Sequence, residues 1–266
     1  MRLGYYKRLW AKLLALNIKK YAIYKLDFII GILAMAMAEI LSVLFFWVIF
    51  QHIPVLNGWI FEEVLFLTSL FMIVFGIWHV FLSGAAFWGL EWLIRRGEFD
   101  RLMLQPVSPL KYLLLARFDD DGLGDLLTGI AVFWYAANAV GFQFSLINII
   151  TLLILLASGT VIFFSLLLSL STISFWIVRS HSIGDILFNL FNFIKYPLNI
   201  FSPLVVTFFT FLLPLGFISY YPAQILLQKE SVSMIAYAGP IVAVIFFIVA
   251  NYIWNIGLKN YTSTGS

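Results

Sequence analysis

Six long apolar runs constrain the fold of this chain more than any other feature of its sequence. Because an α-helix rises about 1.5 Å per residue, about 20 apolar residues cross a hydrocarbon core roughly 30 Å thick. Runs of that kind occupy residues 28–50, 64–85, 123–142, 149–178, 183–201 and 238–258. They are continuous, whereas the strands of a transmembrane β-barrel alternate in polarity over about ten residues. The sequence therefore predicts an all-α polytopic membrane protein with six transmembrane helices.

The composition agrees with a membrane protein and narrows the possible chemistry. Apolar residues make up 63% of the chain and charged residues 11%, and the mean hydropathy is +1.01. Soluble domains are roughly 45–50% apolar and about 25% charged. The chain has no Cys, which excludes disulfides, a thiolate nucleophile and Cys-ligated metals. Its three His are far apart in sequence, so we expect no metal site.

Basic residues are distributed unevenly between the apolar runs. Residues 1–27 contain seven Lys and Arg and residues 86–122 contain five, whereas the connections 51–63 and 143–148 contain none. Loops rich in Lys and Arg stay on the cytoplasmic side of a membrane. We therefore expect both termini, including the tail 259–266, to be cytoplasmic. The same holds for the large 86–122 connection within the membrane domain 28–258.

Residues 1–27 predict an amphipathic helix on the cytoplasmic surface of the membrane. Apolar and aromatic side chains recur at helical spacing on one face: Leu3, Tyr6, Trp10, Leu13, Leu14, Ile18 and Tyr21. Basic side chains cluster on the opposite face: Arg8, Lys12, Lys19 and Lys20. Such a helix binds membrane lipids through both its apolar face and its charges. The alternative is a charge cluster that only sets the topology.

The fifth apolar region is interrupted, and the sequence leaves two arrangements open. It contains Asp185 and Lys195, and four prolines break the region that follows: Pro197, Pro203, Pro214 and Pro222. In one arrangement the chain crosses at 198–219 and 183–195 lies at the interface. In the other it crosses at 183–201 and re-enters the membrane at 204–221. Broken backbone at membrane depth requires surrounding protein or water, and composition alone does not choose between the two.

Motifs for catalysis are missing from the sequence. A P-loop ends in Gly-Lys-Ser or Gly-Lys-Thr, and the chain has no Gly-Lys pair. We therefore expect no catalytic residue and no cofactor in this chain, so that any ATP and Mg are bound by another polypeptide. Residues 122–125 match the Gly-x-Gly-Asp pattern of intramembrane aspartyl proteases, but no Tyr-Asp pair on another span supplies the second carboxylate that this chemistry needs. Asp125 is better explained as an acidic residue at a helix start.

Two features are candidates for a translocation path. Glu39 falls in the middle of the first apolar run, where a charged group costs roughly 2.5–3.5 kcal/mol and should face protein or water. It is either a substrate or proton site or, as we favour, a structural residue that joins helices. Four hydroxyl residues share one face of the fourth run: Ser158, Ser165, Ser169 and Thr172. They could line a path, although close helix packing is the commoner role of such residues.

The cytoplasmic connection contains a segment that is too apolar for a solvated tether. Residues 91–117 read EWLIRRGEFDRLMLQPVSPLKYLLLAR. Residues 98–104 alternate charged and bulky side chains as a short amphipathic helix does. The two prolines in 105–109 then force a stiff turn, because each disfavours helix in the preceding residue. We expect this segment to dock a cytoplasmic partner; the alternative is a membrane-surface helix.

Three blocks of the sequence resemble those of ABC-2 type transporter permeases. They are residues 97–110 (GEFDRLMLQPVSPL), 196–201 (YPLNIF) and 213–223 (LPLGFISYYPA). More narrowly, the chain resembles a bacterial subgroup of six-span permeases encoded beside an ATPase and often a second, diverged permease. The resemblance implies a location in the bacterial cytoplasmic membrane. The chain departs from general ABC-2 exporters in its short 51–63 connection, which argues against a large external lid.

The resemblance also implies roles for particular segments. Residues 1–25 match the family's connecting helix, and the family's re-entrant helices favour the second arrangement of the fifth region. Residues 98–109 match the coupling helix that inserts into the nucleotide-binding subunit. The implied coupling residues are Glu98, Phe99, Asp100, Arg101, Leu104, Gln105, Pro106, Ser108 and Pro109.

The implied partners are P-loop ATPase subunits, which bind ATP and Mg, and a second permease chain. A heterodimer with the diverged permease is preferred over a homodimer, and no nucleic-acid partner is expected. The leading hypothesis is a transporter subunit, an exporter of an amphipathic or lipid-like molecule. A secondary transporter would show inverted repeats and paired broken helices, and the sequence has one broken region. The third hypothesis is a non-transporting membrane scaffold.

Overall fold

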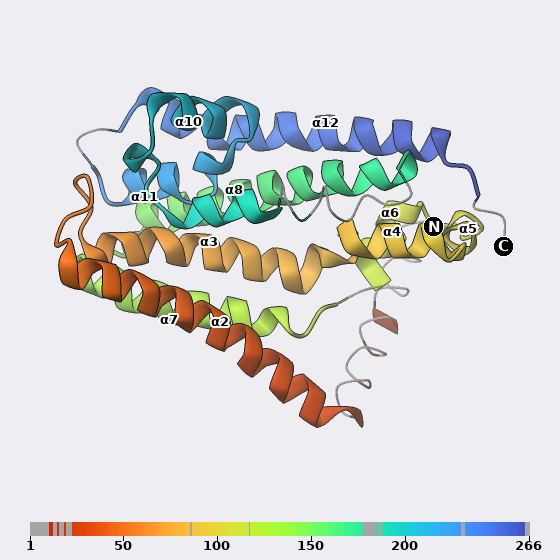
Figure 1. Ribbon diagram of the computed structural model, residues 1–266, viewed down its shortest axis with the longest axis horizontal. Coiled ribbons are helices and arrows are strands. Elements are labelled where there is room, and N and C mark those ends of the chain that lie inside the picture. The colour runs from red at the N-terminus through yellow and green to blue at the C-terminus, as the bar shows by residue number, and fades with distance from the viewer. Residues whose placement is uncertain are drawn as a thin grey trace.

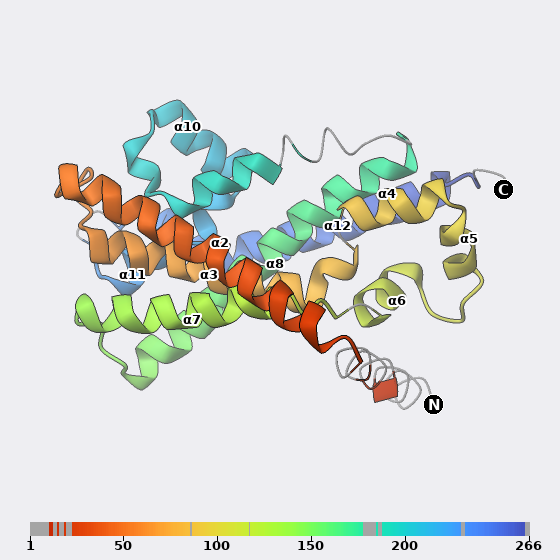
Figure 2. The ribbon, with the colours of Figure 1, turned by 60° about the horizontal axis from the view of Figure 1, so that its bottom comes forward.

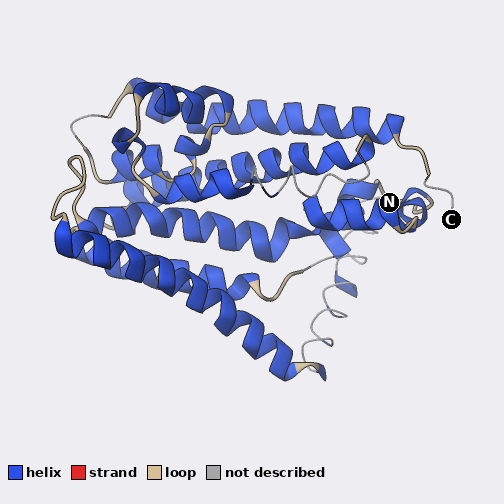
Figure 3. Ribbon diagram, in the orientation of Figure 1, coloured by secondary structure: helices blue, strands red, loops and turns tan. Residues whose placement is uncertain are grey.

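The computed structural model describes residues 23–85, 87–116, 118–177, 188–229 and 232–263, together with positions 11, 12, 15, 19 and 185. Within these ranges the chain is helical and contains no strand (Figure 3). This confirms the all-α prediction. The amphipathic helix expected over 1–27 and the last residues of the tail lie largely outside the described residues.

Five long helices run side by side along the molecule. They are α2 (Lys25–His52), α3 (Phe61–Leu82), α7 (Gly122–Ala139), α8 (Leu146–Thr172) and α12 (Gly239–Asn260) (Figures 1 and 2). Helix α3 lies in the middle of the bundle, between α2 and α7 on one side and α8 on the other, and most of its side chains are buried. The start of α2 and the end of α12 lie at the same end of the bundle, as do the short helices between α3 and α7 (Figure 1). We call this end the α5 end.

Among the described residues, four helical stretches are long and apolar enough to cross a membrane. They are Lys25–His52, Phe61–Leu82, Leu146–Phe175 and Met234–Asn260. The chain is therefore a multi-pass membrane protein, as expected. Helix α7 has 18 residues and packs along α3 and α2, but Asp125 and Asn138 make it less apolar than these four.

The fifth apolar region, expected to cross at 183–201 or at 198–219, is not one continuous helix in its described part. Residues Phe191–Lys195 (η3) and Leu198–Ile200 (η4) form separate 3-10 turns. Between them Tyr196 has an extended backbone with φ of −111° and ψ of 149°. The cause is Pro197, which lacks an amide proton and disfavours helix in the residue before it.

The next segment contains a sharp bend. Helix α10 (Pro203–Thr207) continues into the π-helical turn η5 (Phe208–Leu212). After Leu213 and Pro214, η6 (Leu215–Phe217) leads into α11 (Tyr220–Leu226), which contains Pro222. The two stretches meet at 76°, as in a broken span or a re-entrant loop. If the pair counts as one span, the described part of the chain has five candidates. The bend falls inside the 204–221 segment for which re-entry was expected.

Helix α7 approaches its neighbours closely at glycines. A Cβ atom on Gly124 would clash with the carbonyl oxygen of Ile32 in α2, and one on Gly129 would lie 2.8 Å from Cβ of Met72 in α3. Small residues allow helix backbones to approach in this way in membranes. Helix α2 otherwise stands apart: only Glu39 and Phe46 are buried, and its first half diverges from the bundle (Figure 1).

Candidate functional site

Three short helices form the connection between α3 and α7 at the α5 end. They are α4 (Phe87–Arg95), α5 (Glu98–Met103) and α6 (Pro109–Ala116), preceded by the 3-10 turn η1 (Ser83–Ala85). Gly97 has a φ of 67°, a left-handed conformation that glycine adopts without a steric penalty and that separates α4 from α5. The short helix expected at 98–104 is therefore present as α5, followed by a turn up to Pro109.

The turn after α5 exposes an apolar tip at the extreme end of the molecule (Figure 2). Leu104 is 85% exposed, and Gln105 and Pro106 beside it are exposed as well. We call these three residues the loop tip. Arg101 and Ser108 flank the tip and are exposed, whereas Glu98 is half-buried and Pro109 is buried. An exposed leucine at a turn is available to a partner and contributes little to the fold.

Two of the expected coupling residues face the bundle instead. The Phe99 side chain is fully buried, with its ring centroid 5.3 Å from that of Phe175 and 5.0 Å from that of Tyr261. The Asp100 carboxylate accepts a hydrogen bond of 2.9 Å from the Tyr261 hydroxyl and one of 2.7 Å from the Ser263 hydroxyl. Phe99 therefore fixes α5 to the bundle through buried ring contacts, and the half-buried Asp100 bonds α5 to the residues after α12.

Glu39 forms an ion pair inside the bundle. Its Oε2 lies 3.2 Å from Nζ of Lys195 in η3, and that ammonium also donates to the Ser42 hydroxyl at 3.2 Å. The Lys195 carbonyl oxygen accepts a hydrogen bond from the Thr68 hydroxyl in α3. The geometry agrees with the structural interpretation of Glu39. Sequence reasoning missed Lys195 as the partner, although charged residues within membrane segments generally pair with one another.

A second buried pair lies where α3 and α7 meet. The His79 Nδ1 atom lies 2.7 Å from Oδ2 of Asp125, and its Nε2 lies 3.8 Å from Oδ2 of Asp119. The Asp125 side chain is only 2% exposed. Asp125 is in the first turn of α7, as the helix-start interpretation requires. Its bond to His79 was not expected, because the two residues are 46 positions apart.

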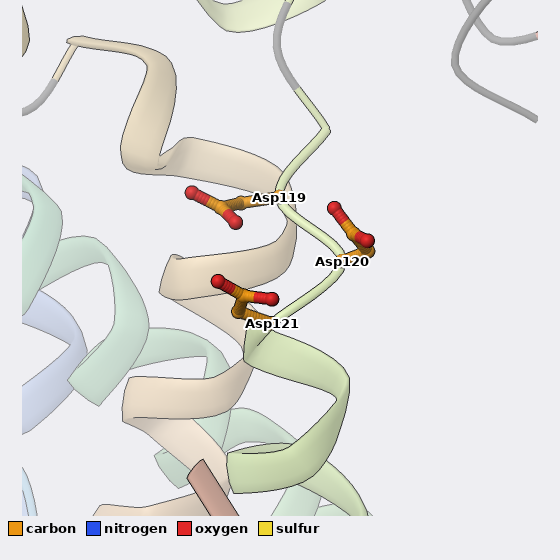
Figure 4. Close-up of side chains that lie close together, drawn as sticks. All are labelled: Asp119, Asp120 and Asp121. Carbon is orange, nitrogen blue, oxygen red and sulfur yellow. The ribbon is translucent and has the colours of Figure 1, made fainter. Parts of the chain in front are cut away.

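One group of acidic residues could hold a metal ion among the described residues. Asp119, Asp120 and Asp121 are successive residues leading into α7 (Figure 4), and one carboxylate oxygen from each lies within 4.8 Å of the others. Carboxylates at a helix start are also stabilised by the helix dipole without any ion. The cluster is therefore explained by its position before α7.

The four hydroxyl residues of α8 bond to their own helix. Each hydroxyl donates to the carbonyl oxygen four residues earlier, over 2.6–2.8 Å, in Ser158, Ser165, Ser169 and Thr172. Ser165 and Thr172 are fully buried. Ser169 lines a cavity of about 230 Å³ formed by α8, α12 and the broken fifth region. Of the four, Ser169 is thus the one that faces an open space.

The sequence was compared with protein families, curated proteins and solved structures. A family model described as ABC-2 family transporter protein matches residues 18–265, which is nearly the whole chain. No curated protein and no solved structure matches significantly.

Proposed function

Because the chain belongs to the ABC-2 transporter family, we propose that it is the permease subunit of an ATP-binding cassette exporter driven by separate ATPase subunits. Permeases of this family generally work with such subunits. The observation that carries the proposal is the loop tip, whose Leu104 is 85% exposed at the end of the bundle. The ATPase partner binds ATP and Mg, and the permease supplies the membrane path.

The loop tip suits a partner with an apolar pocket. An exposed leucine beside a proline gains free energy when a partner removes it from water, at roughly 25 cal/mol per Å² of apolar surface. Arg101, exposed one helical turn before the tip, and the half-buried Glu98 carry charges of both signs that opposite charges on the partner would complement. We therefore propose that Leu104, Gln105 and Pro106 insert into the ATPase, with Arg101 and Ser108 at the edge of the contact.

The orientation of the proposed subunit follows from its basic residues. The connection that carries the loop tip is rich in Lys and Arg, so we place the α5 end in the cytoplasm of a bacterium, with both termini on that side. A second permease chain, preferably the diverged one, completes the path. The outer face of α2 is largely uncovered by its own chain and leaves room for it. An amphipathic or lipid-like molecule is the proposed substrate.

Affinity capture tests the proposal directly. The tagged chain is extracted in mild detergent, and co-purifying proteins are identified and quantified by mass spectrometry. We expect a P-loop ATPase with the unmodified chain and a loss of at least about tenfold with Leu104→Asp, equivalent to about 1.4 kcal/mol of binding free energy. Leu146→Asp is the matched control, since Leu146 is 74% exposed at the start of α8, at the opposite end of the bundle.

The results separate the proposal from its rivals. An ATPase that is absent in several detergents, or equally abundant with Leu104→Asp and with Leu146→Asp, would contradict the docking of the loop tip. A secondary transporter is the second candidate, favoured by the intramembrane Glu39–Lys195 and His79–Asp125 pairs. It predicts substrate movement that follows an ion gradient without ATP. A membrane scaffold predicts neither ATP-dependent nor gradient-dependent movement.

A further inference from the structure

The first and third residues after α12 donate hydrogen bonds to the two oxygens of one carboxylate. The Tyr261 hydroxyl donates to Oδ1 of Asp100 at 2.9 Å, and the Ser263 hydroxyl donates to Oδ2 at 2.7 Å. Tyr261 directly follows the last residue of α12, and Asp100 is in α5. Hydrogen bonds to an ionised acceptor are stronger and shorter than those between neutral groups. The end of the last long helix is thus bonded directly to α5.

Aromatic rings reinforce this connection and extend it to α8. The Phe99 ring packs edge-to-face against both Phe175 and Tyr261, and the Phe175 ring packs against Trp254 of α12 with centroids 5.2 Å apart. Phe175 ends the 3-10 turn η2 (Ile173–Phe175) that continues α8. Edge-to-face pairs at these distances are favourable beyond their buried area. We call Phe99, Asp100, Phe175, Tyr261 and Ser263 the clasp.

A glycine allows α8 and α12 to meet beneath the clasp. A Cβ atom on Gly257 would lie 2.5 Å from the Phe175 ring and 2.6 Å from Cγ2 of Thr172. Any larger residue at this position would therefore push α12 away from α8. The close approach places the end of α8, the end of α12 and α5 in a single packed unit.

The Tyr261 hydroxyl of the clasp keeps its proton near neutral pH. Burial, together with the hydrogen bond to Asp100 and the charge of that carboxylate, raises the pKa of the Tyr261 phenol to about 12. The phenol therefore stays protonated near neutral pH and remains a hydrogen-bond donor. Helix α2, in contrast, packs against α7 and α3 and has only two buried residues, Glu39 and Phe46.

From this geometry we propose that Tyr261 and Ser263 are positioning residues that fix α5 to the ends of α12 and α8. When the ATPase displaces α5, helices α8 and α12 then move together with it as one rigid unit. Helix α2 moves relative to that unit. The transmission of movement from the ATPase rests on the proposed function. The attachment of α5 to α8 and α12 is a property of the isolated chain. The two can therefore be tested separately.

The first experiment uses the permease chain without any ATPase. Because the chain has no Cys, spin labels can be placed uniquely at Met103→Cys in α5 and Ile248→Cys in α12, both exposed positions. The distance distribution is measured by double electron–electron resonance in lipid nanodiscs. We expect a narrow distribution with unmodified Tyr261 and one about twofold broader with Tyr261→Phe combined with Ser263→Ala, because the freed α5 samples local openings.

Control variants show whether the broadening comes from the loss of the two hydrogen bonds or from substitution in general. Tyr252→Phe removes the hydroxyl of an exposed tyrosine on the same helix and should leave the distribution unchanged. Ser263→Thr keeps the hydroxyl and should also preserve the narrow distribution. The clasp would be overturned if the distance distribution of the double variant Tyr261→Phe, Ser263→Ala were as narrow as that of Tyr252→Phe. This holds whatever the function of the protein.

The second experiment uses the complex with the ATPase, trapped with ATP and vanadate. A second pair of labels joins position 103 to Leu33→Cys in α2, an exposed position. Trapping should leave the 103–248 distance unchanged and should change the 103–33 distance. In Tyr261→Phe with Ser263→Ala, the 103–248 distance should become nucleotide-dependent. Equal shifts of the 103–248 and 103–33 distances in the unmodified chain would overturn the proposal. Failure of the ATPase to bind would instead contradict the proposed function, and the first experiment would still decide the clasp.

Discussion

The Nζ atom of Lys195 lies 3.2 Å from Oε2 of Glu39, and this ion pair joins α2 to the broken fifth region across 156 positions of sequence. Both side chains are largely buried. Glu39 is one of only two buried residues in α2, so the pair is a main attachment of this helix. Taking two charges out of water is costly, and each partner is tolerated because the other compensates it.

Breaking the pair should destabilise the protein unless both charges are removed. Glu39→Gln or Lys195→Met alone leaves one uncompensated buried charge, and we expect a loss of about 3–5 kcal/mol. The double variant should recover most of that loss. Unfolding of the purified chain in mixed detergent micelles measures the change, with Asp27→Asn as the control at an exposed position of the same helix. Additive losses in the double variant would show that the two side chains do not act as a pair.

The close approach of α7 and α2 should depend on Gly124. A Cβ atom at this position would clash with the backbone oxygen of Ile32 in α2, so Gly124→Ala requires the helices to separate. We expect a loss of about 1–3 kcal/mol, as for overpacked cores. Gly239→Ala is the matched control, because its Cβ would meet the Phe217 ring at an ordinary 3.6 Å. Detergent unfolding of both variants measures the difference, and equal stabilities would contradict the close packing.

The long apolar helices of this fold could be predicted from sequence, because each helix that crosses a bilayer must by itself be apolar and long enough to do so. The runs at 28–50, 64–85, 149–178 and 238–258 all correspond to helices within a few residues. The prolines of the fifth region indicated an interruption, and the backbone does break at Pro197 and Pro214. The path of the broken segment could not be chosen, because composition does not specify how the pieces on either side of a proline pack.

The contacts of the candidate site were less predictable because they join distant parts of the chain. The loop around α5 was recognised from its alternation of charge and bulk. However, Asp100 is 161 positions from Tyr261, and nothing local to residues 98–104 shows which side chains turn inward. Glu39 was singled out correctly as a buried acid, but its partner Lys195 emerges only when η3 is placed against α2 and α3.

Phe99 and Leu104 should give opposite results in tests of stability and association. Phe99 is fully buried, so Phe99→Ala should cost about 3–5 kcal/mol of stability and lower the melting temperature. Leu104 is exposed, so Leu104→Ala should change stability by no more than about 0.5 kcal/mol. Thermal melting in detergent measures the first effect, and the amount of co-purified ATPase measures the second. A stabilising role for Leu104 would place the loop tip against the permease itself.

Charge reversals at two positions of α5 should distinguish residues that bind the ATPase from residues that attach α5 to the bundle. Glu98 is half-buried at the start of α5, and Glu98→Lys should weaken ATPase association without changing the melting temperature. Asp100→Lys removes the acceptor of two hydrogen bonds and brings a cation into the clasp. It should therefore lower the melting temperature and also weaken association, because α5 is no longer held in position. Asp120→Lys is the control outside α5, and membrane insertion of all three variants is checked by fractionation. Identical melting temperatures for Asp100→Lys and Glu98→Lys would indicate that the Asp100 bonds to the chain end do not hold α5.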